Sequence, residues 1–266
     1  HSFPTRRSSD LGTLFILGGL FLFSLPLYPL RFLPLPLSIV LSGLLLKQAF
    51  SVRFLYRAAR GVRAALLASD LREARRLVSY HLVSRDTSSL SQAEVSSCVI
   101  ESLAENLTDS IVSPLFFFCL GGLPAAWAYR FANPADAMIG YHTPEWEHFG
   151  KFAARLDDLL NGLPARLAGL CLVLAAGLCR LDAPAAWKTM YRQHGRTGSP
   201  NAGWTMAAAA GALGLTLEKP GYYRLEGGPG QPAAPDIGRA ARLVKTALAL
   251  SLLCSAGILV LRAYFF

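Results

Sequence analysis

Long apolar runs dominate this chain and are separated by amphipathic and polar stretches. Residues 14–46 are apolar apart from Arg31 and contain four prolines, which predicts either one kinked membrane span with a partial second one or a tight hairpin. Residues 111–129 and 243–261 are also long enough to span a membrane, whereas the apolar stretch of residues 167–179 is short for a crossing. The pattern predicts an all-α, polytopic integral membrane protein with several transmembrane or re-entrant helices.

Amphipathic helices are predicted between residues 52 and 83, where apolar residues recur at helical spacing with arginines between them. Asp70 and Glu73 have the spacing of a capping pair and would begin the second of these helices. We expect both helices to lie on the membrane surface. A second capping box, from Ser91 to Glu94, predicts the start of another helix.

That next helix carries an acidic block, with Glu101, Glu105 and Asp109 at four-residue intervals. In a helix these carboxylates form one stripe, and like charges at this spacing repel each other. A cation, either a metal ion or a basic substrate, is therefore expected beside them. An apolar stripe that includes Val95 and Val99 lies nearly opposite, so we expect the carboxylates to face away from the packed side.

Composition agrees with a membrane protein, because 53% of the residues are hydrophobic and only 16% are charged, against about 25% charged residues in soluble domains. The net charge of +9 is concentrated between residues 47 and 85. Such a basic excess beside apolar spans indicates a cytoplasmic face and contact with membrane lipid. No basic patch interleaved with aromatic residues is present, so no nucleic-acid partner is expected. The five cysteines lie mostly in apolar runs, as buried hydrophobes would in a reducing environment.

The first residues of the chain are set apart from the rest. Residues 5–11, TRRSSDL, are similar to the conceptual translation of a sequencing adapter, and residues 1–11 are treated as a non-native segment. Residues 12–266 are expected to form a single helical membrane domain that is truncated at its N-terminus.

Polar clusters stand out beside the apolar spans, where ionisable groups are costly and tend to be functional. Any one of them alone is most simply a solvated helix end or a cap. Carboxylate oxygens suit Mg²⁺, and the guanidinium groups of Arg85 and Arg155 suit phosphate or carboxylate. No P-loop, G-x-G-x-x-G, H-E-x-x-H or G-x-S-x-G motif is present, and the spacing of the histidines does not favour a transition-metal site. The candidate site residues are Arg85, Asp86, Glu101, Glu105, Asn106, Asp109, Asn133, Asp136, Arg155, Asp157, Asp158, Asn161, Ser199 and Asn201.

Four sequence blocks together resemble the integral-membrane adenosylcobinamide-phosphate synthase family of cobalamin biosynthesis. They are SRDTSSLSQAEV, ESLAENLTDSIVSPLFFFCLGGLPAAWAYRFANPADAMIGY, FGKFAARLDDLLNGLPARLAGL and SPNAGWTMAAAAGALGL, which lie in this order within residues 84–217. The combination is specific, although each block alone is not. The family's usual opening motifs, Gly-Asp-Pro and His-Pro, do not appear, and Ala135 and Gly162 depart from its pattern.

The resemblance implies a multi-pass ligase of the cell inner membrane. The enzyme would join a carboxylate of adenosylcobyric acid, a corrinoid, to aminopropanol or aminopropanol phosphate, with ATP as co-substrate and Mg²⁺ as cofactor. Other cobalamin-assembly membrane enzymes, or further copies of the chain, are possible partners under this hypothesis. Catalytic roles would fall to Glu101, Glu105, Asp109, Asp157 and Asp158. Glu101, Glu105 and Asp158 are the candidate Mg²⁺ ligands, and which of the five acids is the base and which bind the metal stays open.

The remaining polar candidates would bind substrates. Arg85 and Arg155 would hold the phosphates, while Asn106, Asn161 and Asn201 would orient the corrinoid amides. Asp86, Asn133, Asp136 and Ser199 complete this set.

The acidic block of residues 101–109 and the second acidic block, Asp157 and Asp158, can form one site only if they lie on the same side of the membrane. A full crossing by residues 111–129 would place the blocks on opposite sides of the membrane, so this segment is predicted to be re-entrant or a buried hairpin. Two alternatives remain open: a non-catalytic inner-membrane sensor of the same superfamily, and a cation-coupled transporter.

Overall fold

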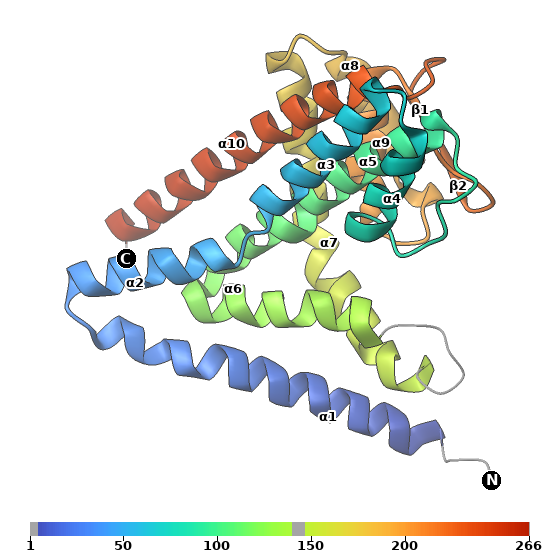
Figure 1. Cartoon of the computed structure of the whole chain (residues 1–266). Coiled ribbons are helices and arrows are strands. Elements are labelled where there is room, and N and C mark those ends of the chain that lie inside the picture. Colours follow the sequence, from blue (N-terminus) through green and yellow to red (C-terminus); the bar gives the residue numbers. More distant parts are fainter. Residues whose placement is uncertain (1–4, 140–146, 266) are drawn as a thin grey trace. The chain divides into compact units, whose positions relative to one another are not determined.

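The structure is a computed structural model that describes residues 5–139 and 147–265, with the side chains of residues 13–134 and 152–265. Figure 1 shows the arrangement of its elements along the chain. The helices are α1 (Thr5–Ser24), η1 (Leu25–Phe32), α2 (Leu35–Gln48), α3 (Val52–Leu67), α4 (Leu71–His81), α5 (Gln92–Leu107), η2 (Thr108–Val112), α6 (Ser113–Ile139), α7 (Glu147–Leu178), α8 (Ala183–Gln193), η3 (His194–Arg196), α9 (Ala202–Leu213) and α10 (Ala234–Phe265). The strands are β1 (Thr216–Lys219) and β2 (Tyr223–Glu226).

The all-α, multi-pass prediction is confirmed. In the described part of the chain, five helical segments are long and apolar enough to cross a membrane, namely Thr13–Phe32, Leu35–Leu67, Gln92–Pro134, Phe152–Leu178 and Ala234–Phe265. The short apolar stretch of residues 167–179 is therefore part of a longer helix, α7. Its polar residues do not interrupt the helix, because hydrogen bonds within the protein satisfy several of them.

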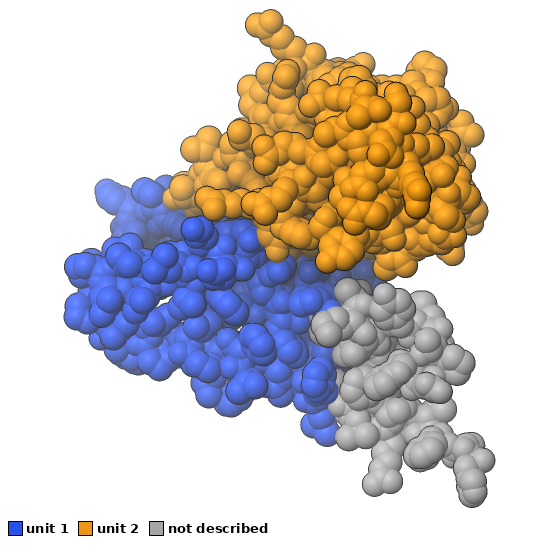
Figure 2. All heavy atoms as spheres, viewed as in Figure 1, with its two compact units in different colours: residues 1–50, 113–162, 258–266 blue, residues 51–112, 163–257 orange. Residues whose placement is uncertain are grey.

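The chain divides into two compact units (Figure 2). Unit 1 contains residues 1–50, 113–162 and 258–266, and unit 2 contains residues 51–112 and 163–257. The single domain expected for residues 12–266 stays a prediction.

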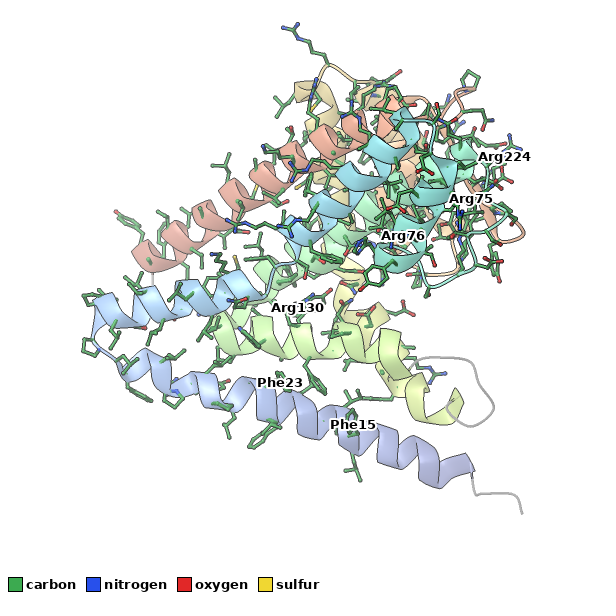
Figure 3. All side chains as sticks on the ribbon, in the orientation of Figure 1. Phe15, Phe23, Arg75, Arg76, Arg130 and Arg224 are labelled. Carbon is green, nitrogen blue, oxygen red and sulfur yellow. The ribbon has the colours of Figure 1, made fainter. Side chains whose placement is uncertain are left out.

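In unit 1 the chain reverses between the first two helices, in agreement with the hairpin alternative for residues 14–46 (Figure 1). Phe131 of α6 packs between Phe15 and Phe23 of α1, with ring centroids 6.3 Å and 5.0 Å apart, respectively. Figure 3 labels the two α1 rings. A Cβ on Gly19 would overlap the Phe131 ring, so glycine at this position lets the two helices approach closely.

Helix α6 is a hairpin and not one straight span. Its backbone leaves the helical conformation at Gly121 and Gly122, and Gly122 has φ 67° and ψ −157°. The rings of Phe117 and Tyr129 then stack with centroids 5.3 Å apart, whereas twelve residues of continuous α-helix would separate them by about 18 Å. The hairpin predicted within residues 111–129 is therefore present.

Unit 2 is built around α9, whose alanine-rich sequence lets neighbouring backbones pack closely on all sides. Residues 207–212 are buried, and α9 packs extensively against α8 and α5. A Cβ on Gly227, in the loop after β2, would overlap the backbone of α9 at Ala210. The small side chains thus bring the β1–β2 hairpin close to the helical core.

The two strands pair antiparallel, with Leu217 opposite Leu225 and both side chains fully buried. The sequence analysis predicted no strand here. The turn signal was present, since Pro220 and Gly221 separate two short runs of alternating polarity. Gly221 has a φ of 77°, which favours glycine.

The amphipathic helices and both capping signals are confirmed. Asp70 accepts a hydrogen bond from the Glu73 backbone N–H at 2.9 Å and caps α4. Ser91 and Glu94 form the predicted capping box at the start of α5.

Candidate active site

The Glu101 carboxylate is held at both oxygens. Ser97, one turn earlier on α5, donates its hydroxyl to Oε1 at 2.6 Å, and Tyr223 on β2 donates its phenol to Oε2 at 2.9 Å. Glu101 is only 6% exposed. The expectation that it faces away from the packed side was wrong, because the β1–β2 hairpin covers a helix face that the sequence pattern alone left open.

The same serine also fixes the hairpin to α5. The backbone N–H of Glu218 on β1 donates to Ser97 Oγ at 3.0 Å, so Ser97 links a strand backbone to the Glu101 carboxylate. Burial raises the pKa of the Tyr223 phenol, and the neighbouring Glu101 charge and hydrogen bond raise it further. Tyr223 therefore stays protonated at neutral pH and remains a hydrogen-bond donor.

Glu101 lines a cavity of about 210 Å³, which lies wholly in unit 2. We call it the Arg85–Glu101 pocket. Its ionisable lining residues combine two cations and two carboxylates with a thiol and a phenol. They are Arg85, Lys219, Glu101, Glu105, Cys98 and Tyr223.

Arg85 places an unsatisfied donor in this region. Its Nη2 donates to the Cys98 sulfur at 2.8 Å, whereas its Nε is buried and has no hydrogen-bond partner. Burial acts to lower the pKa of Arg85, but the hydrogen bond to Cys98 and the nearby Glu101 outweigh it and raise the pKa. A permanently charged guanidinium with an unpartnered N–H is a suitable donor to a carboxylate or phosphate.

The other members of the acidic block lie in different surroundings. Glu105 lines the Arg85–Glu101 pocket together with Glu101. Asp109 follows α5 in the π-helical turn η2 and is not among the pocket-lining residues. The Asn106 amide donates to the Ser102 carbonyl at 3.0 Å and accepts from Ser110 at 3.0 Å, so it bonds along its own helical segment.

Asp86 shapes the loop next to the pocket. Its carboxylate accepts hydrogen bonds from the Ser88 backbone N–H and the Ser88 hydroxyl, both at 2.9 Å. These bonds lower the pKa of Asp86. The structure thus gives Asp86 a local turn-forming contact, and its predicted substrate-binding role stays a prediction.

A second polar cluster lies in unit 1 and contains three predicted residues. Oδ1 of Asn161 accepts hydrogen bonds from Ser113 at 2.6 Å and from Tyr129 at 3.0 Å. The amides of Asn161 and Asn133 both donate to Oδ1 of Asp157, at 3.0 Å and 3.1 Å. We call these five residues the Asn161 cluster. Because Ser113 and Tyr129 lie on either side of the Gly121–Gly122 break, the cluster closes the α6 hairpin.

Three further predicted residues, Arg155, Asp158 and Asp136, also belong to unit 1. Asp158 is half-buried on α7, and Arg155 is exposed. Asp136 lies outside the residues whose side chains the structure describes.

The SPNAGW segment builds the start of α9. The Ser199 hydroxyl accepts hydrogen bonds from the backbone N–H groups of Asn201 and Ala202, at 3.2 Å and 3.3 Å. Trp204 stacks on His194 with centroids 4.0 Å apart, and the Arg166 guanidinium lies 4.7 Å from the Trp204 ring centroid. These contacts account structurally for the motif, and substrate binding by Ser199 and Asn201 stays a prediction.

The predicted Mg²⁺ ligands come from both units. Glu101 and Glu105 belong to unit 2, and Asp158 belongs to unit 1. Among the described residues, no group of three or more His, Cys, Asp or Glu side chains could hold a metal ion. Two carboxylates in one pocket still fit Mg²⁺, which usually takes one or two protein carboxylates and completes its shell with water and substrate oxygens.

Ser97, Cys98, Lys219 and Tyr223 were not predicted from the sequence pattern. Ser97 and Cys98 lie one turn or less before Glu101 on α5, so helical spacing could have identified them. Lys219 and Tyr223 flank the Pro220–Gly221 turn. Only the long-range packing of the hairpin against α5 brings those two residues to the pocket.

Comparison with known proteins identifies the family. A family model described as CobD/Cbib protein matches residues 4–252. The "Probable cobalamin biosynthesis protein CobD" of Methanothermobacter thermautotrophicus is 47% identical over 203 residues, covering 76% of this chain and 68% of that protein. The "Cobalamin biosynthesis protein CobD" of Dehalococcoides mccartyi is 43% identical over 222 residues, which is 83% of this chain and 71% of that protein.

A third relative extends the comparison to the other family name. The "Cobalamin biosynthesis protein CbiB" of Salmonella choleraesuis is 45% identical over 171 residues, and the match spans only 53% of that protein's length. No solved structure matches the chain. The family model and these identities show that the chain belongs to the CobD/CbiB family.

Proposed function

We propose that this protein acts in cobalamin biosynthesis as the adenosylcobinamide-phosphate synthase, an amide-forming ligase of the cell inner membrane. It would join aminopropanol or aminopropanol phosphate to the carboxylate of adenosylcobyric acid at the expense of ATP. The names of its relatives support the pathway, and the motifs of residues 84–217 support the reaction. The observation that carries the proposal is the Arg85–Glu101 pocket, which Arg85, with its buried and unpartnered Nε, lines together with two carboxylates.

Arg85 and Lys219 are the groups suited to the acid substrate. A free carboxylate is a poor electrophile toward an amine, so its oxygen must first be converted into a leaving group, most economically by phosphorylation from ATP. Both the carboxylate and the resulting acyl phosphate are anions. The two cations of the pocket would hold either one, and the fixed hydrogen bond from Arg85 to Cys98 orients the guanidinium.

Glu101 and Glu105 are suited to different tasks. Each oxygen of Glu101 already accepts a hydrogen bond from the protein, which fixes the orientation of this carboxylate. Such a fixed group could accept a proton from the attacking ammonium, which must become a neutral amine before it forms the amide bond. Glu105, at the same pocket, is the better candidate to hold Mg²⁺, which would neutralise phosphate charge.

Genetic complementation tests this proposal. The gene encoding this chain should restore growth on cobyric acid to a strain that lacks the synthase. Glu105→Gln should abolish that growth. The control substitution Glu218→Gln should not, because it makes the same change of charge on the β1–β2 hairpin at a position outside the pocket. Immunoblots of membrane fractions must show equal protein levels. Failure of the unsubstituted chain at normal levels, or normal growth with Glu105→Gln, would contradict the proposal.

A further inference from the structure

Unit 2 contains a second hollow, separate in its lining from the Arg85–Glu101 pocket. It has a volume of about 640 Å³, within the size range of small-molecule sites. We call it the Arg72–Ser88 groove. Helix α4 contributes three arginines, and the loop after it forms the opposite wall. The charged and hydroxyl-bearing residues of these two walls include Arg72, Arg75, Arg76, Asp86, Thr87 and Ser88.

The wall of this groove is fixed to α4 by hydrogen bonds at Arg75. Thr87 donates its hydroxyl to the Arg75 carbonyl at 3.0 Å, and Arg75 Nε donates to the Leu90 carbonyl at 2.7 Å. The Asp86 contacts to Ser88 stiffen the same loop. The groove is therefore shaped before any ligand binds, which reduces the entropy lost on binding.

The groove has an excess of positive charge. Arg76 is neutralised by two 2.7 Å hydrogen bonds to Glu73. Arg72 has no hydrogen bond or ion pair among the described contacts, and Arg75 donates to a neutral carbonyl and forms no ion pair among those contacts, although the Glu94 carboxylate is close enough to interact with it electrostatically. Asp86 is the only carboxylate among the lining residues, and Ser88 already donates to both of its oxygens. By contrast, cations and carboxylates balance in the Arg85–Glu101 pocket.

We propose that the Arg72–Ser88 groove binds the phosphate groups of a small phosphorylated ligand. Guanidinium groups match phosphate oxygens with paired N–H donors, and Figure 3 shows the labelled Arg75 and Arg76 side chains at α4. The exposed ring of Tyr80 at the same groove offers an apolar face for the organic part of the ligand. Asp86, Thr87 and Ser88 of this groove lie in the first of the sequence blocks that resemble the synthase family, so the inference rests on the proposed function, which also guides the choice of ATP as a probe.

Direct binding measurements test the site. Titration calorimetry on the purified protein in detergent would use inorganic phosphate, tripolyphosphate and ATP, each without Mg²⁺. Arg72→Gln should weaken the binding of tripolyphosphate and ATP about tenfold or more, since a charge-assisted hydrogen bond contributes about 1.5–3 kcal/mol. Arg60→Gln on α3 makes the same charge change at an exposed position outside the groove and should leave the affinity within about twofold.

Titration of the same detergent-solubilised protein with a short-chain, water-soluble phosphatidylglycerol separates a lipid headgroup from a free phosphate ligand. Loss of phosphatidylglycerol binding in Arg72→Gln without loss of ATP binding would keep the phosphate site and assign it to lipid. Equal affinities of Arg72→Gln and the unsubstituted protein for every probe would overturn the proposal, and so would equal losses in Arg60→Gln. Because no measurement depends on amide synthesis, failed complementation with intact binding would contradict only the proposed function.

Discussion

The Arg85–Glu101 pocket of unit 2 and the Asn161 cluster of unit 1 both contain carboxylate and hydroxyl groups but use them differently. In the Asn161 cluster, all five residues take part in one hydrogen-bond network that closes the α6 hairpin. In the pocket, Arg85 Nε lacks a partner and the carboxylates line a cavity. Polar side chains beside apolar spans are therefore either structural, as in the Asn161 cluster, or candidates for ligand binding, as in the Arg85–Glu101 pocket. A cavity with an unsatisfied donor distinguishes the second kind from the first.

Different consequences of substitution are expected from this difference. A closed network stabilises a particular backbone arrangement, so its loss lowers stability. A pocket keeps some polar groups ready for a ligand, so substitution there removes activity and leaves the fold largely intact.

Glu101→Gln should produce the largest effect. It removes the carboxylate that would accept a proton from the ammonium substrate. The rate of amide formation should therefore fall by roughly 100-fold or more, as is typical when a general acid–base group is lost. Thermal stability in detergent should change little, because glutamine keeps the volume and removes a buried charge, which offsets the loss of one of the two acceptors for Ser97 and Tyr223. Activity assays and thermal unfolding of the same preparation check both parts. Unchanged activity would place Glu101 with the structural residues of the Asn161 cluster.

Asn161→Ala should have the opposite profile, with a loss of stability. The substitution removes hydrogen-bond partners from Ser113, Tyr129 and Asp157. Hydrogen bonds between membrane helices average about 0.6 kcal/mol each, and with the added packing loss we expect a decrease of about 2–3 kcal/mol in the free energy of unfolding. Denaturation by SDS in mixed micelles measures it. Asn106→Ala is the control, because Asn106 bonds only along its own segment in the described contacts, and a loss equal to that of Asn161→Ala would contradict the closed-network role.

Sequence pattern could predict the elements whose determinants are local. The caps at Asp70 and Ser91 and the glycine break in α6 each depend on residues that lie close together in the sequence. The partners of those elements could not be predicted in the same way. Tyr223 reaches Glu101 across more than a hundred residues, and the only local trace of it was the Pro220–Gly221 turn.

The predicted site residues show the same limit. Asn133, Asp157 and Asn161 were correctly grouped as polar residues near a span, but sequence could not show that they bond to one another. The burial of Glu101 was missed for a related reason. Helical periodicity compares the two faces of one helix, and it does not register a strand pair that covers the polar face.

Gly122→Ala should have a smaller effect than Asn161→Ala. Gly122 has φ 67° and ψ −157°, a conformation that is almost restricted to glycine, and a Cβ there should cost about 1–2 kcal/mol of stability. The same SDS denaturation measures it. Gly43→Ala on α2 is the matched control, because a Cβ at Gly43 meets no atom within 4 Å and alanine suits a helix interior. If Gly43→Ala lowers stability as much as Gly122→Ala, the break at Gly122 does not depend on glycine.

The smallest expected effect is a pH-dependent loosening of the loop beside the Arg85–Glu101 pocket. The hydrogen bonds from Ser88 lower the pKa of Asp86 below its ordinary value of about 3.9. The stabilisation by ionised Asp86 is therefore fully present above that ordinary value and is lost as the pH falls through the lower folded-state pKa. Because Asp86 is exposed, the effect should be confined to the loop. In acid, hydrogen exchange of the Ser88 amide should become faster relative to its intrinsic rate. Asp86→Asn should remove most of this pH dependence, because asparagine keeps a hydrogen-bond acceptor but carries no charge. An equal acid response in Asp86→Asn would show that another group controls the loop.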